Sequence, residues 1–328
     1  MKRMVARLFT GIGIAIAVGA ASLPAMAQTY PERPIKLIVG FPPGGGGDVL
    51  GRLLAVELNE AWKQPVIVDN RPGAGANIAS EAVARSAADG YTLLIGGDFS
   101  HAINPALYKK LAFDTKKDFA PVTRLANYPM IIAVHPSVPA NSLREFITLA
   151  KASPGKFEFA SSGNGTPPHL AGVLFNQEAG LDILHIPFKG GGPAVTSTVA
   201  GQTALLMGTG PSTIPQAKAG KLRILAVTTR DSSPVVPGAP GTAEAGLPSL
   251  NINGWWGMWA PAGTPQAVID KLFEKVSEIM QRPGIQEKLG RSGLVASTSR
   301  SPAEFGEFVD GQARVLGKLV RDTGTTVD

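Results

Sequence analysis

Short runs of apolar residues alternate along this chain with stretches in which apolar residues recur every three or four positions. The first pattern is typical of buried strands, and the second of helices that pack against a sheet. In the first third, strands are predicted at 35–39, 66–68 and 92–95, with helices at 48–60 and 77–88. Continuous apolar strands joined by helices favour a mainly parallel sheet covered on both faces, so we expect an α/β fold.

A second series of such units begins near residue 131. Strands are predicted at 131–134, 157–160, 183–186, 204–207 and 224–227, and helices at 142–151, 168–179, 193–200 and in a short segment ending at 219. Ser142 and Glu145 form a capping box, and Gly180 and Gly201 stand where helices stop. A stretch rich in Pro, Gly and Ser at 232–246 ends the series.

The C-terminal part contains one further strand and then helices. The strand is predicted at 254–260, and amphipathic helices follow at 265–280 and after the capping box at Ser301. A helical segment without its own sheet must pack on an earlier one. We therefore expect two lobes, 28–127 plus 255–328 and 128–254, with crossovers near Tyr128 and Gly254 and a ligand cleft between the lobes.

The first 27 residues have the pattern of an export signal, with a basic start, an apolar stretch at 8–18 and a small-x-small cleavage site at 25–27. Cleavage would make Gln28 the first mature residue, in the periplasm. The apolar stretch is shorter than the roughly 20 residues of a membrane helix, and no later stretch approaches that length. The mature chain is therefore not expected to span a membrane. Without adjacent arginines in the leader, export of an unfolded chain is the simpler interpretation.

Composition narrows the function further. Removal of the 27-residue export signal from the 328-residue chain leaves 301 residues. A typical domain has roughly 150 residues, so this length is enough for about two domains. The leader holds three of the 31 basic residues, so the net charge falls from +6 to about +3, which gives little support to a nucleic-acid partner. The absence of cysteine excludes disulfides, thiolate metal sites and thiol nucleophiles.

Glycine-rich or glycine-serine loops repeatedly follow a predicted strand and lead into a helix. They are found at 41–48, 71–77, 96–100, 161–166 and 188–192. Such a loop places unpaired backbone N–H groups at the positive end of a helix dipole, where they can hold an anion without a charged side chain. Several of these loops facing one cleft would form a carboxylate site.

The loop Gly44-Gly45-Gly46-Gly47-Asp48 permits three interpretations: phosphate binding, a tight turn, or binding of a carboxylate or other polar ligand. No Gly-Lys-Ser/Thr follows it and no G-x-G-x-x-G spacing fits, so a nucleotide site is disfavoured. The segment 161–169 adds three hydroxyls and backbone donors before a helix, although simple capping would explain it too. No G-x-S-x-G nucleophile motif is present.

The titratable residues give no metal or cofactor motif, and neither is predicted. The four histidines lack the H-E-x-x-H spacing of a zinc site. His101 and His169 are near glycine loops and could either line a cleft or form hydrogen bonds with the scaffold. His135 and His185 are expected to be structural. Asp48 and Asp98 could act as an acid–base pair, but capping is the simpler role. Lys189 could attract an anion or be solvated. Trp255, Trp256 and Trp259 could form a stacking surface, but a strand anchored in the core is the preferred interpretation.

Several motifs in one order resemble a known family. They are Tyr30-Pro31-Glu32-Arg33-Pro34-Ile35, Phe41-Pro42-Pro43 with the glycine loop, Asn70-Arg71-Pro72-Gly73-Ala74-Gly75, His101-Ala102-Ile103-Asn104-Pro105, Ser162-Gly163-Asn164-Gly165-Thr166 with His169-Leu170, Pro187-Phe188-Lys189-Gly190, and Ala219-Gly220-Lys221-Leu222-Arg223. Across the mature chain they resemble the Bug family, the periplasmic solute receptors associated with tripartite tricarboxylate transporters.

The resemblance implies a two-lobed, type II-like periplasmic binding protein that closes on a small carboxylate, held largely by backbone amides and ordered water. Carried over by position, it indicates Phe41, Gly44, Gly45, Gly46, Gly47, Asp48, Gly75 and Asn77 in the first lobe, and Ser162, Gly163, Gly165, Thr166, His169, Phe188, Lys189 and Gly190 in the second. The remaining candidates for the cleft are Asp98, Ser100, His101 and Thr209.

Three positions depart from the family pattern. Asp98 stands where a small or hydroxyl residue is usual, Phe188 where Tyr is common, and Met207–Gly210 where an Asp-containing strand end is frequent. An added carboxylate would oppose a second ligand carboxylate and favour an amine or hydroxyl. Loss of a phenol would make that wall less polar.

The function expected from these observations is a non-catalytic receptor for a small organic, aromatic or amino acid. The closed form would be recognised by a membrane permease or by the extracytoplasmic domain of a sensor. Two alternatives remain open: a periplasmic hydrolase or isomerase that uses Asp48, Asp98 and His101, and a structural envelope protein without a ligand.

Overall fold

The computed structural model describes residues 30–327, so the predicted export signal at 1–27 lies outside the described residues. Three parallel strands begin the fold, with β1 (Ile35–Val39) between β2 (Val66–Asn70) and β3 (Thr92–Gly97). The strands predicted at 35–39, 66–68 and 92–95 are confirmed, although β3 runs on through Gly96 and Gly97, which were expected to form a loop.

The helices between these strands start and stop slightly away from the predicted residues. α1 (Gly46–Trp62) begins after Gly45, two residues before the predicted cap at Asp48, which lies in the first turn instead. η1 (Ala74–Ala76) and α2 (Asn77–Ala84) follow β2, and α2 is shorter than the predicted 77–88.

Two long strands run against the direction of their neighbours. β4 (Phe119–Val134) pairs antiparallel with β9 (Asn253–Pro261) as far as Pro129, and β9 pairs antiparallel with β3. From Met130 onward β4 pairs instead with β7 (Leu205–Thr209) and β8 (Arg223–Val227). The expectation of a mainly parallel sheet is therefore wrong for the middle of the sheet. The chain leaves along β4 and returns along β9, so these neighbours run in opposite directions.

The second set of elements repeats the parallel pattern. β7, β5 (Glu158–Ser161) and β6 (Leu184–Pro187) are parallel in that order. Their helices are α4 (Leu143–Lys151), α5 (Pro167–Ala179), α6 (Gly191–Val199) and α7 (Gly210–Lys218). The predicted cap of α4 is confirmed, because Ser142 Oγ accepts from the Glu145 amide at 3.2 Å. α5 ends, as predicted, at a left-handed Gly180 with φ 62°.

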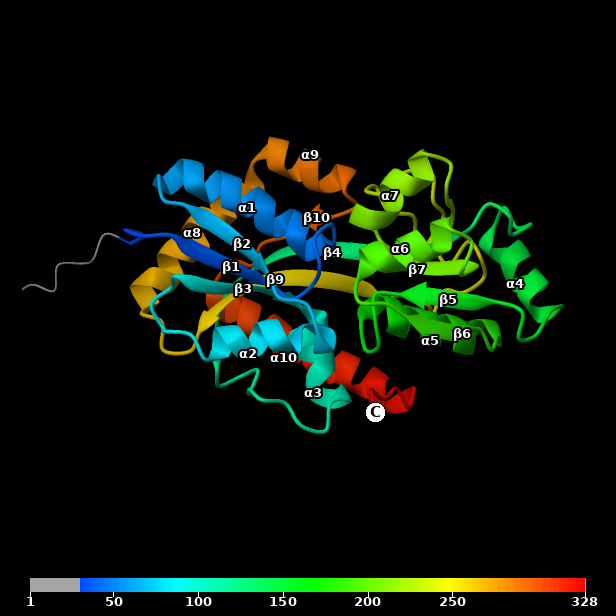
Figure 1. The fold of residues 1–328 in the computed structure, drawn as a ribbon, viewed down its shortest axis with the longest axis horizontal. Helices are drawn as coiled ribbons and strands as arrows, with labels where there is room; N and C mark the ends of the chain where they lie inside the picture. The colour runs from blue at the N-terminus through cyan, green and yellow to red at the C-terminus, as the bar shows by residue number, and fades with distance from the viewer. Residues whose placement is uncertain (1–29, 328) are drawn as a thin grey trace, which may run out of the picture. The chain divides into compact units, whose positions relative to one another are not determined.

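The C-terminal helices return to the first set of strands. α8 (Gln266–Gln281) packs on α1 and β4, and α10 (Pro302–Asp322) packs on η2 (Phe99–Ile103) and α3 (Asn104–Leu107). α9 (Pro283–Arg291) lies between them in the chain, and the short β10 (Val295–Ala296) pairs with β4. Helices lie on both sides of the strands (Figure 1). We call the elements around β1, β2, β3 and β9 the first lobe and those around β5, β6 and β7 the second lobe.

The changes of pairing occur close to the predicted crossovers. β4 exchanges β9 for β7 and β8 directly after Tyr128 and Pro129, and β9 begins at Asn253. The exact boundaries at 127/128 and 254/255 stay a prediction.

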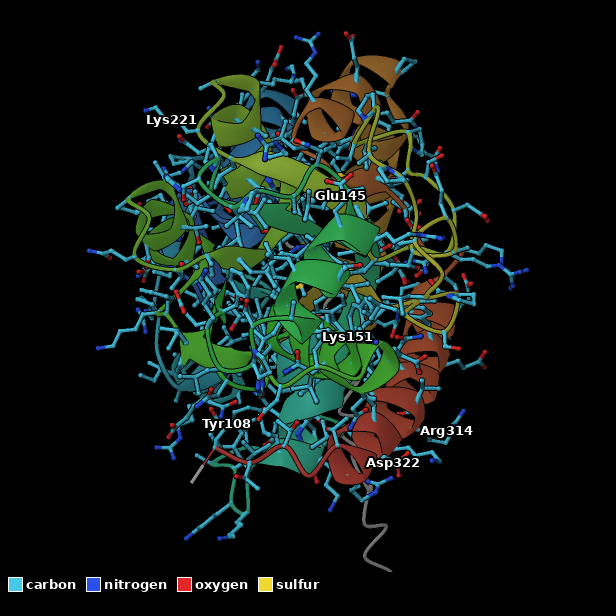
Figure 2. The ribbon with its side chains drawn as sticks, turned by 90° about the vertical axis from the view of Figure 1, so that its right-hand side faces the viewer. Tyr108, Glu145, Lys151, Lys221, Arg314 and Asp322 are labelled. Atoms are coloured by element: carbon cyan, nitrogen blue, oxygen red, sulfur yellow. The ribbon has the colours of Figure 1, made fainter. Side chains whose placement is uncertain are left out.

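Each lobe has its own apolar core. In the first lobe Phe305 of α10 packs on Trp255 and Trp259 of β9, with ring centroids 6.1 and 4.9 Å away. In the second lobe, Ile131 and Leu206 are fully buried in a cluster formed by β4, β7 and the helices α6 and α7. Charged side chains such as Lys221, Arg314 and Asp322 project outward (Figure 2). Within residues 30–327 no helix is both long and apolar enough to cross a membrane.

Candidate functional site

Helix starts without side-chain caps provide the backbone donors of the site. α1 begins after Gly45, α6 after Gly190 and α7 after Thr209, and no side chain caps any of these three helices. The first amide N–H groups of a helix have no partner inside the helix, so in these three they are available to an acceptor from outside, except at Pro193 of α6 and Pro211 of α7, which have no N–H.

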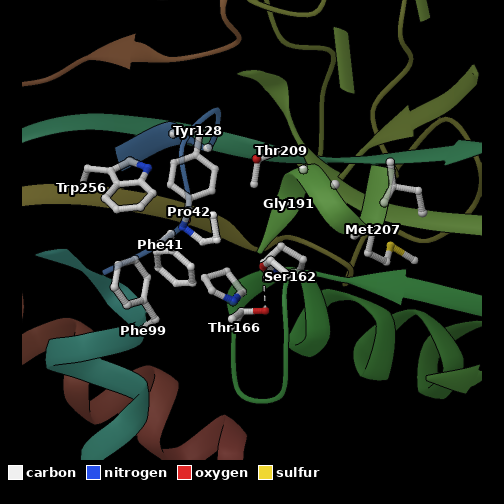
Figure 3. A pocket seen from close by; sticks show the side chains of 18 residues that line it. Phe41, Pro42, Phe99, Tyr128, Ser162, Thr166, Gly191, Met207, Thr209 and Trp256 are labelled. Atoms are coloured by element: carbon white, nitrogen blue, oxygen red, sulfur yellow. Dashed lines mark hydrogen bonds between the residues drawn. The ribbon is translucent and has the colours of Figure 1, made fainter. Parts of the chain in front are cut away.

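These helix starts meet at one pocket between the lobes, which we call the aromatic pocket (Figure 3). The space inside it that the centre of a water molecule can reach is ≈ 40 Å³, room for about three water molecules. Both lobes contribute to it. The lining residues are Phe41, Pro42, Gly45, Gly46, Phe99, Tyr128, Ser162, Thr166, Pro167, Pro168, Gly191, Gly192, Ala194, Leu206, Met207, Gly208, Thr209 and Trp256.

Aromatic rings from the first lobe form one wall. Phe99 lies edge-on to Phe41 and Trp256, with ring centroids 4.7 and 5.1 Å apart, and Tyr128 lies 6.1 Å from Trp256. Glycine makes this packing possible, because a Cβ on Gly47 would lie 2.7 Å from the Trp256 ring. The glycines in the first turn of α1 therefore allow the helix start to pack directly against the aromatic wall.

Hydroxyl groups lie beside the aromatic wall (Figure 3). Ser162 Oγ donates to Thr166 Oγ1 at 3.0 Å, and Thr166 Oγ1 donates to the Gly163 carbonyl at 2.7 Å. Thr209 lines the pocket at the start of α7. Among the described residues that line the pocket, none has a charged side chain, so polar recognition by them depends on hydroxyls and backbone amides.

An outer groove of ≈ 630 Å³ adjoins the aromatic pocket and shares Phe41, Pro42, Ser162 and Thr166 with it. The groove is lined by Gly40, Phe41, Pro42, Pro72, Gly73, Ala74, Gly75, Ala76, Tyr108, Ser162, Gly163, Asn164, Thr166, Phe188, Lys189 and Val327. Of the described residues that line the groove, one has a charged side chain, the exposed Lys189. The groove is thus the more polar entrance to a largely apolar pocket.

The lobes touch over the pocket in this conformation. A Cβ on Gly190 would lie 3.0 Å from Pro42 Cδ, and a Cβ on Gly165, whose φ is +72°, would lie 1.8 Å from Leu107 Cδ2. Loops of the second lobe therefore approach the first lobe at positions where only glycine fits.

Of the twenty predicted site residues, ten line the aromatic pocket or the outer groove and ten line neither.

 The aromatic pocket takes Phe41, Gly45, Gly46, Ser162, Thr166 and Thr209, and the outer groove adds Gly75, Gly163, Phe188 and Lys189. The others line neither space: Gly44, Gly47, Asp48, Asn77, Asp98, Ser100, His101, Gly165, His169 and Gly190.

Asp48 holds the first glycine loop in shape. Its carboxylate accepts from the Gly44 amide at 3.0 Å and pairs with Arg52 at 2.9 Å. Burial raises the pKa of Asp48, but the hydrogen bonds from Arg52 and Gly44 outweigh it, so the pKa lies below its usual range. Asn70 completes the support by donating to the Phe41 carbonyl at 2.9 Å.

Asp98, Ser100 and His101 lie in the interior of the first lobe. The fully buried Asp98 carboxylate accepts from the amides of Phe99 at 2.8 Å and Trp255 at 2.9 Å, and burial raises its pKa to about 7. β3 turns into η2 at Asp98 and directs its side chain toward β9. Burial, and after it the Asp98 charge, raises the pKa of Tyr128, which lines the pocket, and the repulsion between Asp98 and a ligand carboxylate stays a prediction.

His101 lies in a different network from Asp98 and Asp48. Its Nδ1 is 2.9 Å from Ser100 Oγ, its ring stacks on Trp259 with centroids 3.9 Å apart, and burial lowers its pKa to about 3. The three residues expected to serve a hydrolase or isomerase are therefore not gathered in the pocket.

The remaining predicted residues support the loops from behind. His169 Nδ1 accepts from the Gly165 amide at 3.1 Å, and its ring stacks on His185 with centroids 4.1 Å apart. Burial lowers the pKa of His169 to about 4 and that of His185 to about 3. Asn77 Oδ1 accepts from Asn104 Nδ2 at 2.6 Å, which fixes the turn before α2.

Sequence reasoning missed much of the pocket wall. Tyr128 and Phe99 were not predicted as site residues, and Trp256 was assigned to the core. The sequence feature that could have indicated this wall is the tryptophan-rich strand beside the predicted crossovers. Alternation of side chains along a strand does not by itself tell which face of the strand meets the other lobe. Within residues 30–327 no group of three or more His, Cys, Asp or Glu side chains could hold a metal ion.

The fold and the pocket define the class of protein. Two α/β lobes connected by neighbouring strands, with helix starts from both lobes meeting at an interlobe pocket, are the arrangement of an extracytoplasmic solute-binding protein.

Comparison with known proteins identifies the family. Residues 50–325 match the tripartite tricarboxylate transporter family receptor. The chain is 35% identical over 319 residues to Protein BugT of Bordetella pertussis, covering 97% of this chain and 98% of that protein. The solved structure of R. palustris Rpa4515 with adipate has a TM-score of 0.88 at 32% identity, covering 90% of this chain and 99% of that one. MatC from Rhodopseudomonas palustris with bound malate has a TM-score of 0.82 at 30% identity, covering 89% and 100%.

The chain therefore belongs to the tripartite tricarboxylate transporter receptor family and is an extracytoplasmic solute receptor of the Bug type. The resemblance drawn from its sequence motifs is confirmed.

Proposed function

We propose that this receptor binds a small carboxylate in the aromatic pocket and presents it, in the closed state, to a membrane permease. The observation that carries the proposal is the meeting of three helix starts without side-chain caps, those of α1, α6 and α7, at one pocket whose described lining residues carry no charge. The helix dipole and the free N–H groups favour an anion there. The adipate and malate complexes of two relatives support a carboxylate.

Closure follows from the position of the donors. Gly45 and Gly46 belong to the first lobe, whereas Gly191 and Thr209 belong to the second, so a ligand contacts all of them only when the lobes are together. A ligand that binds the closed state better shifts the equilibrium toward it. A permease that recognises surfaces of both lobes would thereby distinguish loaded from empty receptor.

The proposed receptor is not an enzyme. Asp48, Asp98 and His101 are engaged in separate networks and none lines the pocket. A bound acid should therefore be recovered unchanged after prolonged incubation, as mass spectrometry would show. Chemical conversion of the acid would contradict this part of the proposal.

A thermal-shift screen of organic acids, followed by calorimetry, tests binding. An acid present at 100 times its dissociation constant should stabilise the protein by about 2.7 kcal/mol. Gly45→Val should abolish binding while preserving cooperative unfolding, because a Cβ at Gly45 meets nothing closer than 3.8 Å but projects from a lining residue. Gly284→Val is the matched control, since a Cβ there has no neighbour within 4 Å and Gly284 lies outside the pocket. Equal affinity in both variants would refute the placement.

The export part of the proposal concerns the residues before Tyr30. We propose cleavage after Ala27, which gives a periplasmic protein that begins at Gln28. Mass spectrometry of the protein from a periplasmic extract should show this N-terminus, whereas an intact Met1 would overturn it.

A further inference from the structure

The segment that follows α10 lies at the outer groove. α10 ends at Asp322, and the chain then runs toward Tyr108 (Figure 2). Val327, which is half-buried, lines the groove together with Tyr108. Residues near a chain terminus are usually poorly ordered unless other contacts hold them. We call residues 324–327 the strap, and its position at the groove requires a physical cause.

The end of α10 directs the strap. Gly324 has a left-handed φ of 63°, which turns the chain away from the helix, and its amide donates to the Arg321 carbonyl at 3.2 Å. The Thr325 amide donates to the Val320 carbonyl at 3.2 Å, and these two hydrogen bonds are those of a Schellman motif. Thr323 Oγ1 and Thr325 Oγ1 lie 2.8 Å apart and add a side-chain hydrogen bond. The first half of the strap is therefore fixed to α10, and so to the first lobe.

The first-lobe wall of the outer groove is held in one shape. Ala74 and Ala76 line the groove with left-handed φ angles of 47° and 72°. Between them, the Gly75 carbonyl accepts from Asn104 Nδ2 at 2.9 Å. A Cβ on Gly75 would lie 3.1 Å from the Tyr108 hydroxyl oxygen, so this turn packs directly on Tyr108. The groove cannot widen on this side unless these contacts break.

Loops of the second lobe complete the groove. Asn164 and Lys189 line it from that lobe. The lobes meet directly beside Tyr108, because a Cβ on Gly165 would lie 1.8 Å from Leu107 Cδ2. With the lobes together, the groove is therefore bounded by the turn of the first lobe, the loops of the second lobe and the strap.

The aromatic pocket has little room of its own. The centre of a water molecule can reach ≈ 40 Å³ of it, room for about three water molecules, whereas the outer groove offers ≈ 630 Å³. The two spaces share Phe41, Pro42, Ser162 and Thr166, so they are continuous. The part of a ligand that the aromatic pocket cannot hold extends into the groove, which Val327 lines.

We propose that the strap limits the length of the acid that the receptor accepts, with Val327 as a specificity-determining residue. This inference rests on the proposed function and specifies its substrates: linear acids whose chain fits between the aromatic pocket and the strap. A longer chain would overlap with Val327 or would have to displace the strap from the groove, and either event weakens binding.

Calorimetry with succinate, adipate, suberate and sebacate, four linear acids of increasing length, tests the role of the strap. The variant lacks residues 326–328 but retains Thr325, so the hydrogen bonds at the end of α10 are preserved. The deletion should strengthen binding of sebacate by at least about tenfold and change that of succinate by less than about twofold. An equal effect on all four acids, or binding of none of them while another acid binds, would overturn the inference and leave the proposed function intact. Failure of every acid in the screen would refute the proposed function itself.

Substitutions at one side chain test Val327 itself. Val327→Ala should favour the longer acids in the same direction as the deletion but by a smaller factor, whereas Val327→Trp should weaken sebacate binding by at least about tenfold relative to succinate. Val315→Ala is the matched control and should leave all four affinities unchanged, because Val315 lies on α10, is 64% exposed and lines neither space. Thermal unfolding of each variant checks that it is folded. Equal length preferences in the wild type and both Val327 variants, or the same shift in Val315→Ala, would overturn the role of Val327.

Discussion

Asp98 is a buried carboxylate without a positive partner among the described residues, and replacing it with Asn should change how stability depends on pH. Asp98 accepts hydrogen bonds from two backbone amides, but burial still raises its pKa from 3.8 to about 7. The amide of Asn resembles the protonated acid, since each group is uncharged and has a carbonyl oxygen that accepts and a second group that donates hydrogen bonds. Asp98→Asn therefore mimics the neutral form at every pH.

The expected magnitude follows from the two pKa values. Between pH 3.8 and about 7 the unfolded chain releases the Asp98 proton while the folded chain retains it. Stability from the raised pKa is thus fully present below 3.8 and is lost as the pH rises through about 7. A difference of about 3 pKa units corresponds to about 4 kcal/mol.

Urea unfolding followed by tryptophan fluorescence from pH 3.5 to 8 measures this difference. The wild-type protein should lose about 4 kcal/mol relative to Asp98→Asn between about pH 4 and 7, and the difference should be constant above that range. Asp182→Asn, at an exposed aspartate, is the control and should follow the wild-type curve. Parallel curves for the wild type and both variants would refute the reasoning about Asp98.

Three further predictions concern other parts of the molecule. The free energy of unfolding should fall as the pH drops below 6.5, because burial lowers the pKa of His101 to about 3, of His169 to about 4 and of His185 to about 3. Urea titrations should show a shallower fall for His101→Gln than for the wild-type protein. An equal fall in the two proteins would contradict this prediction. Phe305→Ala should reduce the free energy of unfolding by about 3–5 kcal/mol but leave ligand affinity unchanged, which denaturation and calorimetry would check. Gly210→Ala should weaken ligand binding about tenfold in calorimetry, because its Cβ would lie 2.4 Å from the carbonyl oxygen of Ser292 in the other lobe and would oppose closure of the lobes. An unaltered affinity would argue against this contact.

The strands within continuous apolar runs could be predicted from the sequence, whereas most of the long central strand could not. β1 is apolar apart from the exposed Lys36 and lies beside a turn signal, so its position follows from the local pattern. β4 extends from Phe119 to Val134, but Pro121 and Pro129 interrupt its first part, and proline normally argues against a central strand. Shifts in the register between β4 and β9 accommodate this irregular segment. These shifts depend on the distant partner strand, so the local sequence does not reveal them.

The predicted glycine loops 41–48, 161–166 and 188–192 contribute lining residues to the aromatic pocket, but the roles of individual polar residues required the structure. Gly45 and Gly46 line the pocket because they lie at the start of α1. Asp98 lies one residue beyond β3 and was expected in the cleft, yet its carboxylate binds an amide of Trp255, 157 residues away in the chain. Trp256 likewise lines the pocket because of contacts between distant segments of the chain, such as its contact with Phe99, and the local sequence pattern does not contain these contacts.

The most direct test of the central claim is a crystal structure of the receptor with the tightest-binding acid from the screen. The account predicts the ligand carboxylate in the aromatic pocket, about 2.7–3.2 Å from backbone nitrogens at the start of α1, with the lobes closed over it. A carboxylate bound elsewhere, or in the pocket without contact to any helix start, would contradict it.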